Sequence, residues 1–409
     1  MSRGSRFIRE GLAKPTVFKD EAPLSIDYIP TKLPHREKQL RFLSQIFRST
    51  LERPGSMGQK VLITGSVGVG KTILAQHFGL DLMKVARTRK IHMSYVHVNC
   101  RECRGSLFLV LKRILGALKA SFPQRGYSSE ELLEKLMDTL DRENIYLVLA
   151  LDELESLIGS EGPTPIYNLT RIQETRFSAP IRLSLICILR EPEFLHKLDP
   201  STLSTLQQNL IQLEGYSSTH LKTILEDRVK LAFRDGAVSR ETVEFVSDVA
   251  SAKGDARYAI ELLWRAGKYA DVDVSSEVSP EHVRMAVGSI YPAFREDYVK
   301  ALSLHEKLLL LGVSRALTHL DVAYATMGEV EKAYGVVCEE YGEKPRTHTQ
   351  VWKYVKGLGT IGVLSTKKVG KGVRGKTTMI GLTSASAVAT GKMLESSLEV
   401  FRRKLPRAG

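Results

Sequence analysis

The chain has 409 residues, of which 43% are hydrophobic and 26% are charged, and its formal net charge is +13. This length allows two or three domains, each with its own core. No apolar run reaches the roughly eighteen residues of a membrane-spanning helix, and the basic N-terminus lacks the apolar stretch of a secretory signal. We therefore expect a cytoplasmic protein, and the positive charge indicates a polyanionic partner.

A glycine-rich segment follows the first predicted strand. An extended arm, a helix (35–50) and the break at Pro54-Gly55 precede an apolar strand at 60–64, and helical spacing covers 71–86. Between strand and helix lies the pattern G-x-x-x-x-G-K-[ST], formed by Gly65, Ser66, Val67, Gly68, Val69, Gly70, Lys71 and Thr72. Its glycines let backbone N–H groups converge on phosphate oxygens at a helix N-terminus. The pattern predicts a site for ATP or ADP, with Lys71 on the β- and γ-phosphates and Thr72 on Mg²⁺.

A strand at 93–98 and helices at 106–120 and 130–142 come next. Cys100 and Cys103 form a C-x-x-C pair after this strand, but a structural zinc site needs a second pair, and Cys187 and Cys338 are isolated in the sequence. We interpret the pair as reduced thiols at a strand end.

An acidic pair ends the third strand. Residues 145–151 are an apolar run followed by Asp152 and Glu153. At the carboxyl edge of a parallel sheet, Asp152 would lie beside the phosphate loop as a Mg²⁺ ligand, and Glu153 would orient or deprotonate the attacking water. The alternative is that the pair only caps the next helix. The loop upstream favours the catalytic interpretation.

Alternation of strands and helices continues through a helix at 166–177 and strands at 182–188 and 209–213, which predicts an α/β domain with a parallel sheet covered on both faces. After Gly215 the strands stop. Four helical segments follow, at 217–234, 239–251, 255–269 and 279–290. We place domain boundaries so that residues 1–213 bind nucleotide, 214–292 form a helical lid, and 293–409 form a third domain.

The third domain has the pattern of a winged helix. Three amphipathic helices (302–317, 328–341, 347–358) precede two strands (360–369, 376–382) around the glycine-rich turn 370–375. Between Glu343 and Glu395 there is no acidic residue but ten Lys or Arg. This α+β domain is predicted to bind double-stranded DNA with its third helix in the major groove and its basic hairpin on an adjacent groove or the backbone. The weaker alternative is a module for protein contacts alone. The residues predicted to contact DNA are Thr347, Thr349, Gln350, Lys353, Lys356, Lys367, Lys368, Lys371, Arg374 and Lys376.

The order of motifs resembles the archaeal origin-recognition and replication-initiator family of AAA+ ATPases, relatives of the eukaryotic origin-recognition and licensing subunits. The resemblance covers nearly the whole chain. The motifs that match are Asp27-Tyr28-Ile29-Pro30, Leu33-Pro34-His35-Arg36-Glu37, the phosphate loop, Leu151-Asp152-Glu153, Leu198-Asp199-Pro200, Gly254-Asp255-Ala256-Arg257 with Ala259, and the winged domain.

The resemblance implies several further roles. Tyr28, Ile29 and Pro30 should line the adenine pocket, to which we also assign Tyr216. Arg257, at the start of a lid helix, should reach the γ-phosphate as a sensor of phosphate number. An initiator-specific helix that touches DNA would correspond to the region from Arg101 to Arg113.

Two positions depart from the family pattern. The strand before the first sensor should end in a polar residue, usually Asn, and here Arg190 aligns best. Family members carry basic residues after Leu-Asp-Pro that can act on a neighbour's nucleotide, whereas residues 201–208 contain no Arg or Lys. An arginine acting in trans accelerates GTPases by roughly 10³–10⁵. We therefore expect slow hydrolysis, or an activating residue elsewhere, with ATP serving as a conformational switch.

The resemblance implies an ATP-dependent, nucleoid-associated replication initiator that recognises origin DNA and works with the replicative helicase and other initiator subunits. The rival hypothesis is a transcriptional regulator with the same architecture, which physical reasoning from the residues does not separate from an initiator. A clamp-loader-like subunit is disfavoured by the C-terminal winged domain.

Overall fold

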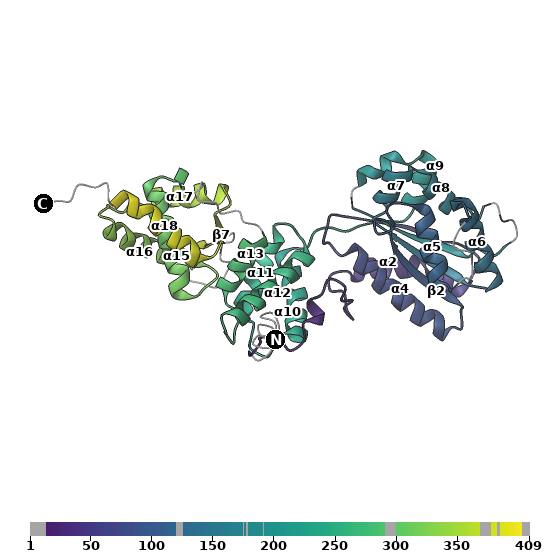
Figure 1. Cartoon of the computed structure of the whole chain (residues 1–409), viewed down its shortest axis with the longest axis horizontal. Helices are drawn as coiled ribbons and strands as arrows, with labels where there is room; N and C mark the ends of the chain where they lie inside the picture. Colours follow the sequence, from purple (N-terminus) through teal and green to yellow (C-terminus); the bar gives the residue numbers. More distant parts are fainter. Residues whose placement is uncertain are drawn as a thin grey trace, which may run out of the picture. The chain divides into compact units, whose positions relative to one another are not determined.

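The computed structural model describes residues 14–119, 126–174, 176, 179–190, 192–290, 300–368, 378–382 and 385–402. The chain forms two compact units (Figure 1). The nucleotide-binding unit contains Asp27–His220 and Lys253–Ala256. The second unit contains the described residues of the N-terminal segment up to Ile26, Leu221–Ala252, and the chain from Arg257 onward.

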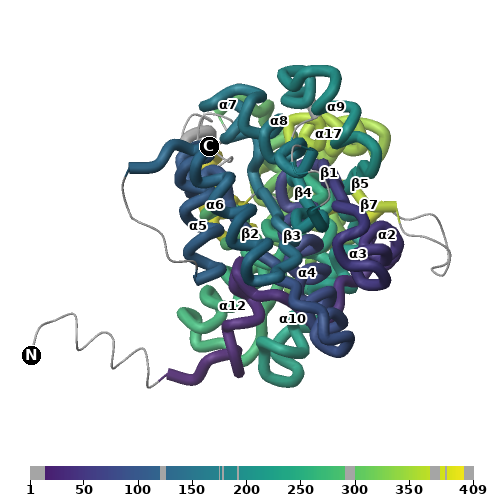
Figure 2. The backbone as a smooth tube through the Cα atoms, turned by 90° about the vertical axis from the view of Figure 1, so that its right-hand side faces the viewer, coloured from purple at the N-terminus to yellow at the C-terminus, as the bar shows by residue number. Residues whose placement is uncertain are grey.

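A five-stranded parallel sheet forms the centre of the nucleotide-binding unit, with the order β2-β3-β4-β1-β5 (Figure 2). Its strands are β1 (Lys60–Thr64), β2 (Met93–Asn99), β3 (Tyr146–Asp152), β4 (Leu183–Leu189) and β5 (Leu210–Gln212). Alternate residues of β1 enter two different cores. Leu62 packs with α5 and α6, whereas Val61 and Ile63 pack with α2 and α4. Both faces of the sheet are therefore covered, as the apolar strands predict.

Helices surround this sheet (Figure 1). They are α2 (Glu37–Ile46), α3 (Arg48–Glu52), α4 (Lys71–Thr88), α5 (Leu107–Ala117), α6 (Ser129–Arg142), α7 (Glu155–Glu161), α8 (Thr164–Arg171) and α9 (Pro200–Gln207), with the 3₁₀ helix η2 (Pro192–Lys197). A further 3₁₀ helix, η1 (Ala22–Leu24), belongs to the second unit. The single helix expected at 166–177 was wrong in its bounds, because Gly162, with φ 74°, and Pro163 separate α7 from α8 and the helix ends at Arg171. The helix expected at 35–50 likewise divides at Phe47.

The second unit contains the predicted lid helices. They are α10 (Ser218–Ala232, of which the first residues lie in the other unit), α11 (Arg240–Ser251), α12 (Ala256–Val272) and α13 (Pro280–Ile290). The N-terminal segment packs against these helices. Phe18 is 4% exposed and its ring lies 4.7 Å from that of Phe233, and Thr16 donates its hydroxyl to Asp271 over 2.8 Å.

The C-terminal part is the predicted winged helix. It contains α15 (Leu304–Leu320), β6 (Ala325–Thr326), α16 (Met327–Glu340), α17 (His348–Thr360), β7 (Leu364–Lys368), β8 (Thr378–Leu382) and α18 (Ala387–Arg402). The three strands form an antiparallel sheet in the order β6-β8-β7. The sequence interpretation missed β6 and α18. Within the described ranges, no helix combines the length and apolar character needed to cross a bilayer.

A buried arginine joins the lid to the winged helix. Arg284 of α13 is 1% exposed and donates to three backbone carbonyls, of Val322 at 2.6 Å, Ala323 at 3.0 Å and Leu382 at 3.2 Å. One turn earlier, the Glu281 carboxylate accepts the N–H of Ala387 at the start of α18 over 3.1 Å. A guanidinium is suited to this position because its fixed donors match several acceptors at once.

Candidate nucleotide and DNA sites

The phosphate loop has the backbone that its glycines predict. Gly65, Gly68 and Gly70 have φ values of 147°, 75° and 89°, a region that side chains disfavour. Lys71, 7% exposed, donates its ammonium to the carbonyls of Gly65 at 2.5 Å and Ser66 at 2.7 Å. Helix α4 starts at Lys71, so its N-terminal N–H groups lie at the loop. Val69 is fully buried and Val67 is 50% exposed, so these two loop residues contribute backbone rather than chemistry.

Two side chains approach the loop closely. A Cβ atom on Gly68 would lie 1.8 Å from a carboxylate oxygen of Asp255, and Ala256 donates its N–H to the Gly68 carbonyl over 3.1 Å. A Cβ atom on Gly70 would lie 2.9 Å from the hydroxyl of Tyr216. These positions therefore require glycine for space as well as for backbone angles. The motif at residues 254–256 lies directly on the phosphate loop.

Thr72 and Asp152 come together as predicted. The Thr72 hydroxyl donates to Asp152 over 2.6 Å, and His97 Nε2 of β2 lies 3.2 Å from the same carboxylate oxygen. Burial would raise the pKa of Asp152, but the hydrogen bonds from His97 and Thr72 outweigh burial and lower the pKa below its ordinary value. Two hard oxygen ligands on adjacent elements fit Mg²⁺. The contact from His97 was missed, although its position on a strand beside the acidic pair was a usable signal.

Glu153 is held by arginines. Its φ is 51°, uncommon for a residue with a side chain. Arg190 Nη2 donates to the Glu153 carboxylate, and its Nε lies 3.3 Å from Glu155. Arg101 Nη1 lies 4.0 Å from the other Glu153 oxygen. Burial raises the pKa of Glu155, with Arg190 opposing that rise. The residue aligned with the first sensor is thus an ion-pair partner of the predicted base.

An aromatic and cationic cluster lies beside the loop. Tyr216 is 5% exposed, and Arg36 donates its Nε to the Tyr216 hydroxyl over 3.1 Å. The Arg36 guanidinium also donates to the Val69 carbonyl over 2.8 Å, and burial raises the pKa of Tyr216 while Arg36 opposes this. His35 stacks on His220 with ring centroids 4.1 Å apart. Arg36 and His35 were named only as part of a motif, and their roles were missed.

The other residues predicted to contact nucleotide lie in two segments that are distant from the phosphate loop in the sequence. Tyr28, Ile29 and Pro30 are half-buried. Their segment contacts α4, because Nε2 of His77 lies 3.1 Å from the carbonyl oxygen of Thr31. Arg257 is exposed at the second residue of α12 and belongs to the other compact unit. Its assignment as a sensor remains a prediction. In the region proposed for an initiator-specific helix, Arg113 of α5 pairs with Glu102 at 2.7 Å.

Helix α17 and its N-cap residue carry five of the ten residues predicted to contact DNA. Thr347, Thr349, Lys353 and Lys356 are exposed, and Gln350 is half-buried. The Lys356 ammonium lies 5.5 Å from the centre of the Trp352 ring. The buried face of α17 consists of Val351, Val355 and Leu358, so the polar residues occupy the opposite face.

The base of the wing is joined to the lid. Lys367 of β7 donates to Asp248 of α11 over 2.7 Å, and Lys368 is exposed. Lys371, Arg374 and Lys376, which were also predicted to bind DNA, lie outside the described residues.

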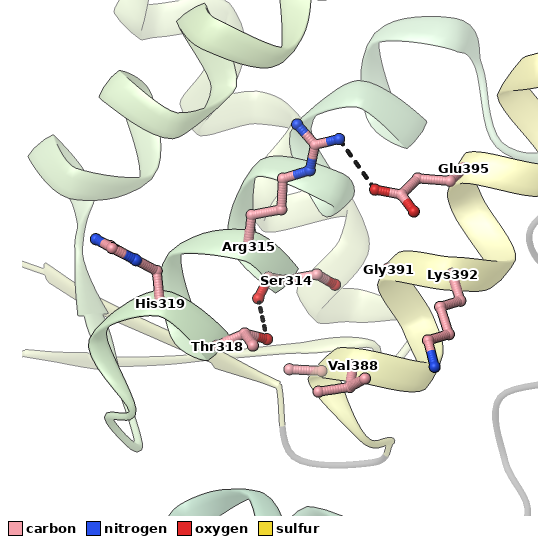
Figure 3. Close-up of a pocket in the computed structure, with 9 residues that line it drawn as sticks. Ser314, Arg315, Thr318, His319, Val388, Gly391, Lys392 and Glu395 are labelled. Carbon is pink, nitrogen blue, oxygen red and sulfur yellow. Dashed lines mark hydrogen bonds and ion pairs between the residues drawn. The ribbon is translucent and has the colours of Figure 1, made fainter.

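A shallow groove of about 390 Å³ lies elsewhere, between α15 and α18 (Figure 3). Arg315, one of the cations that line it, forms ion pairs with Glu340 at 2.6 Å and Glu395 at 2.9 Å. None of the residues assigned to nucleotide or DNA lines it.

Sequence comparisons identify the three parts in chain order. Residues 56–198 match an AAA domain, 222–288 the Cdc6 AAA+ ATPase-type lid domain, and 297–389 the CDC6 C-terminal winged helix domain. The chain is 37% identical to ORC1-type DNA replication protein 2 of Sulfurisphaera tokodaii, over 92% of each chain. It belongs to the ORC1/Cdc6 family of DNA replication proteins. It is also 30% identical to the ORC1-type DNA replication protein of Thermococcus kodakarensis, over 90% of this chain and 88% of that one.

Solved structures of the ORC1/Cdc6 family have the same architecture. Cdc6p from Pyrobaculum aerophilum has a TM-score of 0.82 and 28% identity, covering 94% of this chain and 99% of that one. The Aeropyrum pernix ORC1 protein in complex with DNA has a TM-score of 0.61 and 28% identity, covering 95% of this chain and all of that one. The family resemblance and the predicted fold are confirmed. Membership of the AAA+ class implies a bound nucleotide, usually with Mg²⁺.

Proposed function

We propose that this ORC1/Cdc6 chain is an ATP-dependent initiator of DNA replication that binds origin duplex DNA through its winged helix and AAA+ domain. The observation that carries the proposal is the ordered match of AAA, lid and winged-helix domains, together with similarity over nine-tenths of the chain to ORC1-type replication proteins. The rival, a transcriptional regulator, is not favoured by these relatives. Domain boundaries near residues 213 and 292 are part of the proposal.

The nucleotide part of the proposal assigns each loop residue a task. The N–H groups of the loop and α4 hold the phosphates, Lys71 neutralises their charge, and Tyr28, Ile29, Pro30 and Tyr216 hold the base. Thr72 and Asp152 would hold Mg²⁺, which when bound neutralises charge on the β- and γ-phosphates.

Hydrolysis would use Glu153. Water oxygen bonds to the γ-phosphorus, the bond from that phosphorus to the ADP oxygen breaks with its electron pair on ADP, and the water proton passes to the Glu153 carboxylate. We expect this step to be slow, because Glu153 is ion-paired and residues 201–208 supply no cation for a neighbouring subunit. ATP then acts as a switch, with Arg257 transmitting the phosphate state to the lid.

The DNA part assigns α17 to the major groove and the wing to the backbone or an adjacent groove. Thr349, Gln350 and Lys353 supply donors and acceptors for base edges, and the wing cations supply sequence-independent attraction. On this proposal the bound initiator helps to recruit the replicative helicase together with other initiator subunits.

Genome-wide DNA occupancy tests the proposal. We expect occupancy to concentrate at replication start sites and to fall in cells carrying Lys71→Ala. Occupancy at scattered promoters, with none at start sites, would instead establish the transcriptional alternative.

A further inference from the structure

The proposed catalytic base is engaged from two sides. Arg190 donates to one oxygen of the Glu153 carboxylate, and Arg101 lies 4.0 Å from the other. Arg190 is 32% exposed and Glu153 21% exposed, so the pair is only partly screened by solvent. A general base must accept a proton from water within hydrogen-bonding distance. A carboxylate directed at guanidinium groups is poorly arranged for that task.

Arg190 lies where a nucleotide would compete for it. Strand β4 pairs with β1 in a register that sets Leu189 opposite Thr64, so Arg190 follows β4 where Gly65 follows β1. Parallel strands carry both residues to the same sheet edge. The backbone of Arg190 therefore lies beside the start of the phosphate loop. A terminal phosphate offers three charged oxygens, and charge-assisted bonds from Arg to phosphate are among the strong ones.

We infer that Arg190 is a positioning residue that restrains Glu153 through their ion pair, so that Glu153 acts as a base only in the fraction of triphosphate-bound molecules in which the guanidinium has turned to the terminal phosphate. The inference rests on the proposed nucleotide function. It makes the unusual residue at the end of β4 a restraint on hydrolysis rather than a simple replacement for asparagine. A diphosphate, lacking that terminal group, leaves the ion pair in place.

The first test compares four full-length proteins: the native chain, Arg190→Asn, Glu153→Gln and the double variant. Asparagine keeps a polar group for phosphate but has no charge with which to form an ion pair with Glu153. We expect Arg190→Asn to raise the single-turnover ATP hydrolysis rate at least about tenfold, part of the roughly 10²–10⁴-fold that a general base contributes. The dissociation constant for ATP should stay within about threefold. The double variant should be as inactive as Glu153→Gln, because the gain passes through Glu153.

Arg176→Asn is the matched control. Arg176 is 25% exposed and bridges two carboxylates, Asp138 and Asp141, on the same unit. Its replacement should leave hydrolysis unchanged. Arg190→Lys, which keeps the charge but loses the planar fork, should give an intermediate rate and serves if the asparagine variant is unstable.

A second readout does not depend on turnover. A double-mutant cycle measures the coupling free energy between Arg190 and Glu153 from the thermal unfolding of the four proteins. We expect favourable coupling without nucleotide. A non-hydrolysable ATP analogue should reduce this coupling, whereas ADP should leave it unchanged. An unchanged or lower rate in Arg190→Asn, or a gain that survives Glu153→Gln, would overturn the restraint. Failure of the native protein to bind ATP would instead contradict the proposed function itself, and the inference with it.

Discussion

Thr72 and Asp152, eighty residues apart in the chain, are joined by a hydrogen bond of 2.6 Å. The bond connects the first turn of α4 to the last residue of β3. The phosphate loop and the acidic pair are therefore neighbours in the structure, as the sequence motifs predict. A nucleotide site at this place has direct consequences for substitutions.

Replacing Lys71 with Ala should weaken ATP binding by two orders of magnitude or more. The change removes the loop's own side-chain cation, which lies at the carbonyls of Gly65 and Ser66. A fluorescence titration with a labelled ATP analogue measures the affinity. Lys84→Ala, on the exposed face of the same helix, is the control. Native affinity in the Lys71 variant would contradict the phosphate site.

Replacing Glu153 with Gln should leave ATP bound but reduce its hydrolysis by about 10² or more, because the loop, Thr72 and Asp152 remain while the water loses its base. Phosphate release and nucleotide affinity, measured on the same preparation, separate the two effects. Glu134→Gln, exposed on α6, is the control. Undiminished hydrolysis would show that Glu153 is not the base.

Replacing Lys371 and Arg374 together with Ala should weaken binding to all duplexes. If both touch phosphate, the dependence of log K on log salt should flatten by about 0.9 per lost contact. Fluorescence anisotropy over a salt series, on specific and random duplexes, measures both quantities. Unaltered affinity and slope would mean that the wing cations serve something other than DNA.

Replacing Gln350 with Ala should have a different effect. Gln is suited to adenine, and this side chain is half-buried on the helix assigned to the major groove. We expect discrimination among sequences to fall by about 1–3 kcal/mol while the salt slope stays nearly constant. A uniform loss on specific and random duplexes would place Gln350 at the backbone instead of a base.

Replacing Arg284 with Met should destabilise the joined lid and winged helix by about 3 kcal/mol, since three backbone carbonyls and Glu281 lose their donor in a buried place. Urea unfolding followed by tryptophan fluorescence reports the change. Arg265→Met is the control, because its pair with Glu261 on α12 is exposed and contributes little. Equal stability of the two variants would show that Arg284 is dispensable.

The local patterns were sufficient for most of the fold. Apolar runs of strand length predicted all five strands of the parallel sheet. The pattern is clearest in β3 and β4, which are buried on both faces and therefore consist almost entirely of apolar residues. Helix α18 was missed, although its buried residues Ala387, Leu394 and Leu398 have helical spacing. The two-residue strand β6 is too short for any periodicity to reveal.

The candidate site was predictable only where a motif fixes it. Fixed spacing encodes a local backbone, and the structure has Asp152 beside the loop, as the motifs indicate; the nucleotide-binding roles of these residues stay predictions. The pairing of Arg190 with Glu153, and of Asp255 with the loop, depends on distant segments meeting at one sheet edge. No local pattern encodes such a meeting, so these contacts became visible only in three dimensions.

The ammonium group of Lys367, in the wing, donates a hydrogen bond to Asp248 of the lid. If a DNA phosphate replaces Asp248 as the partner of Lys367, then by thermodynamic reciprocity DNA loosens this attachment of the lid by as much as the attachment weakens DNA binding. In that case, duplex binding and the attachment of the lid to the wing are coupled, so that a change in either one shifts the other.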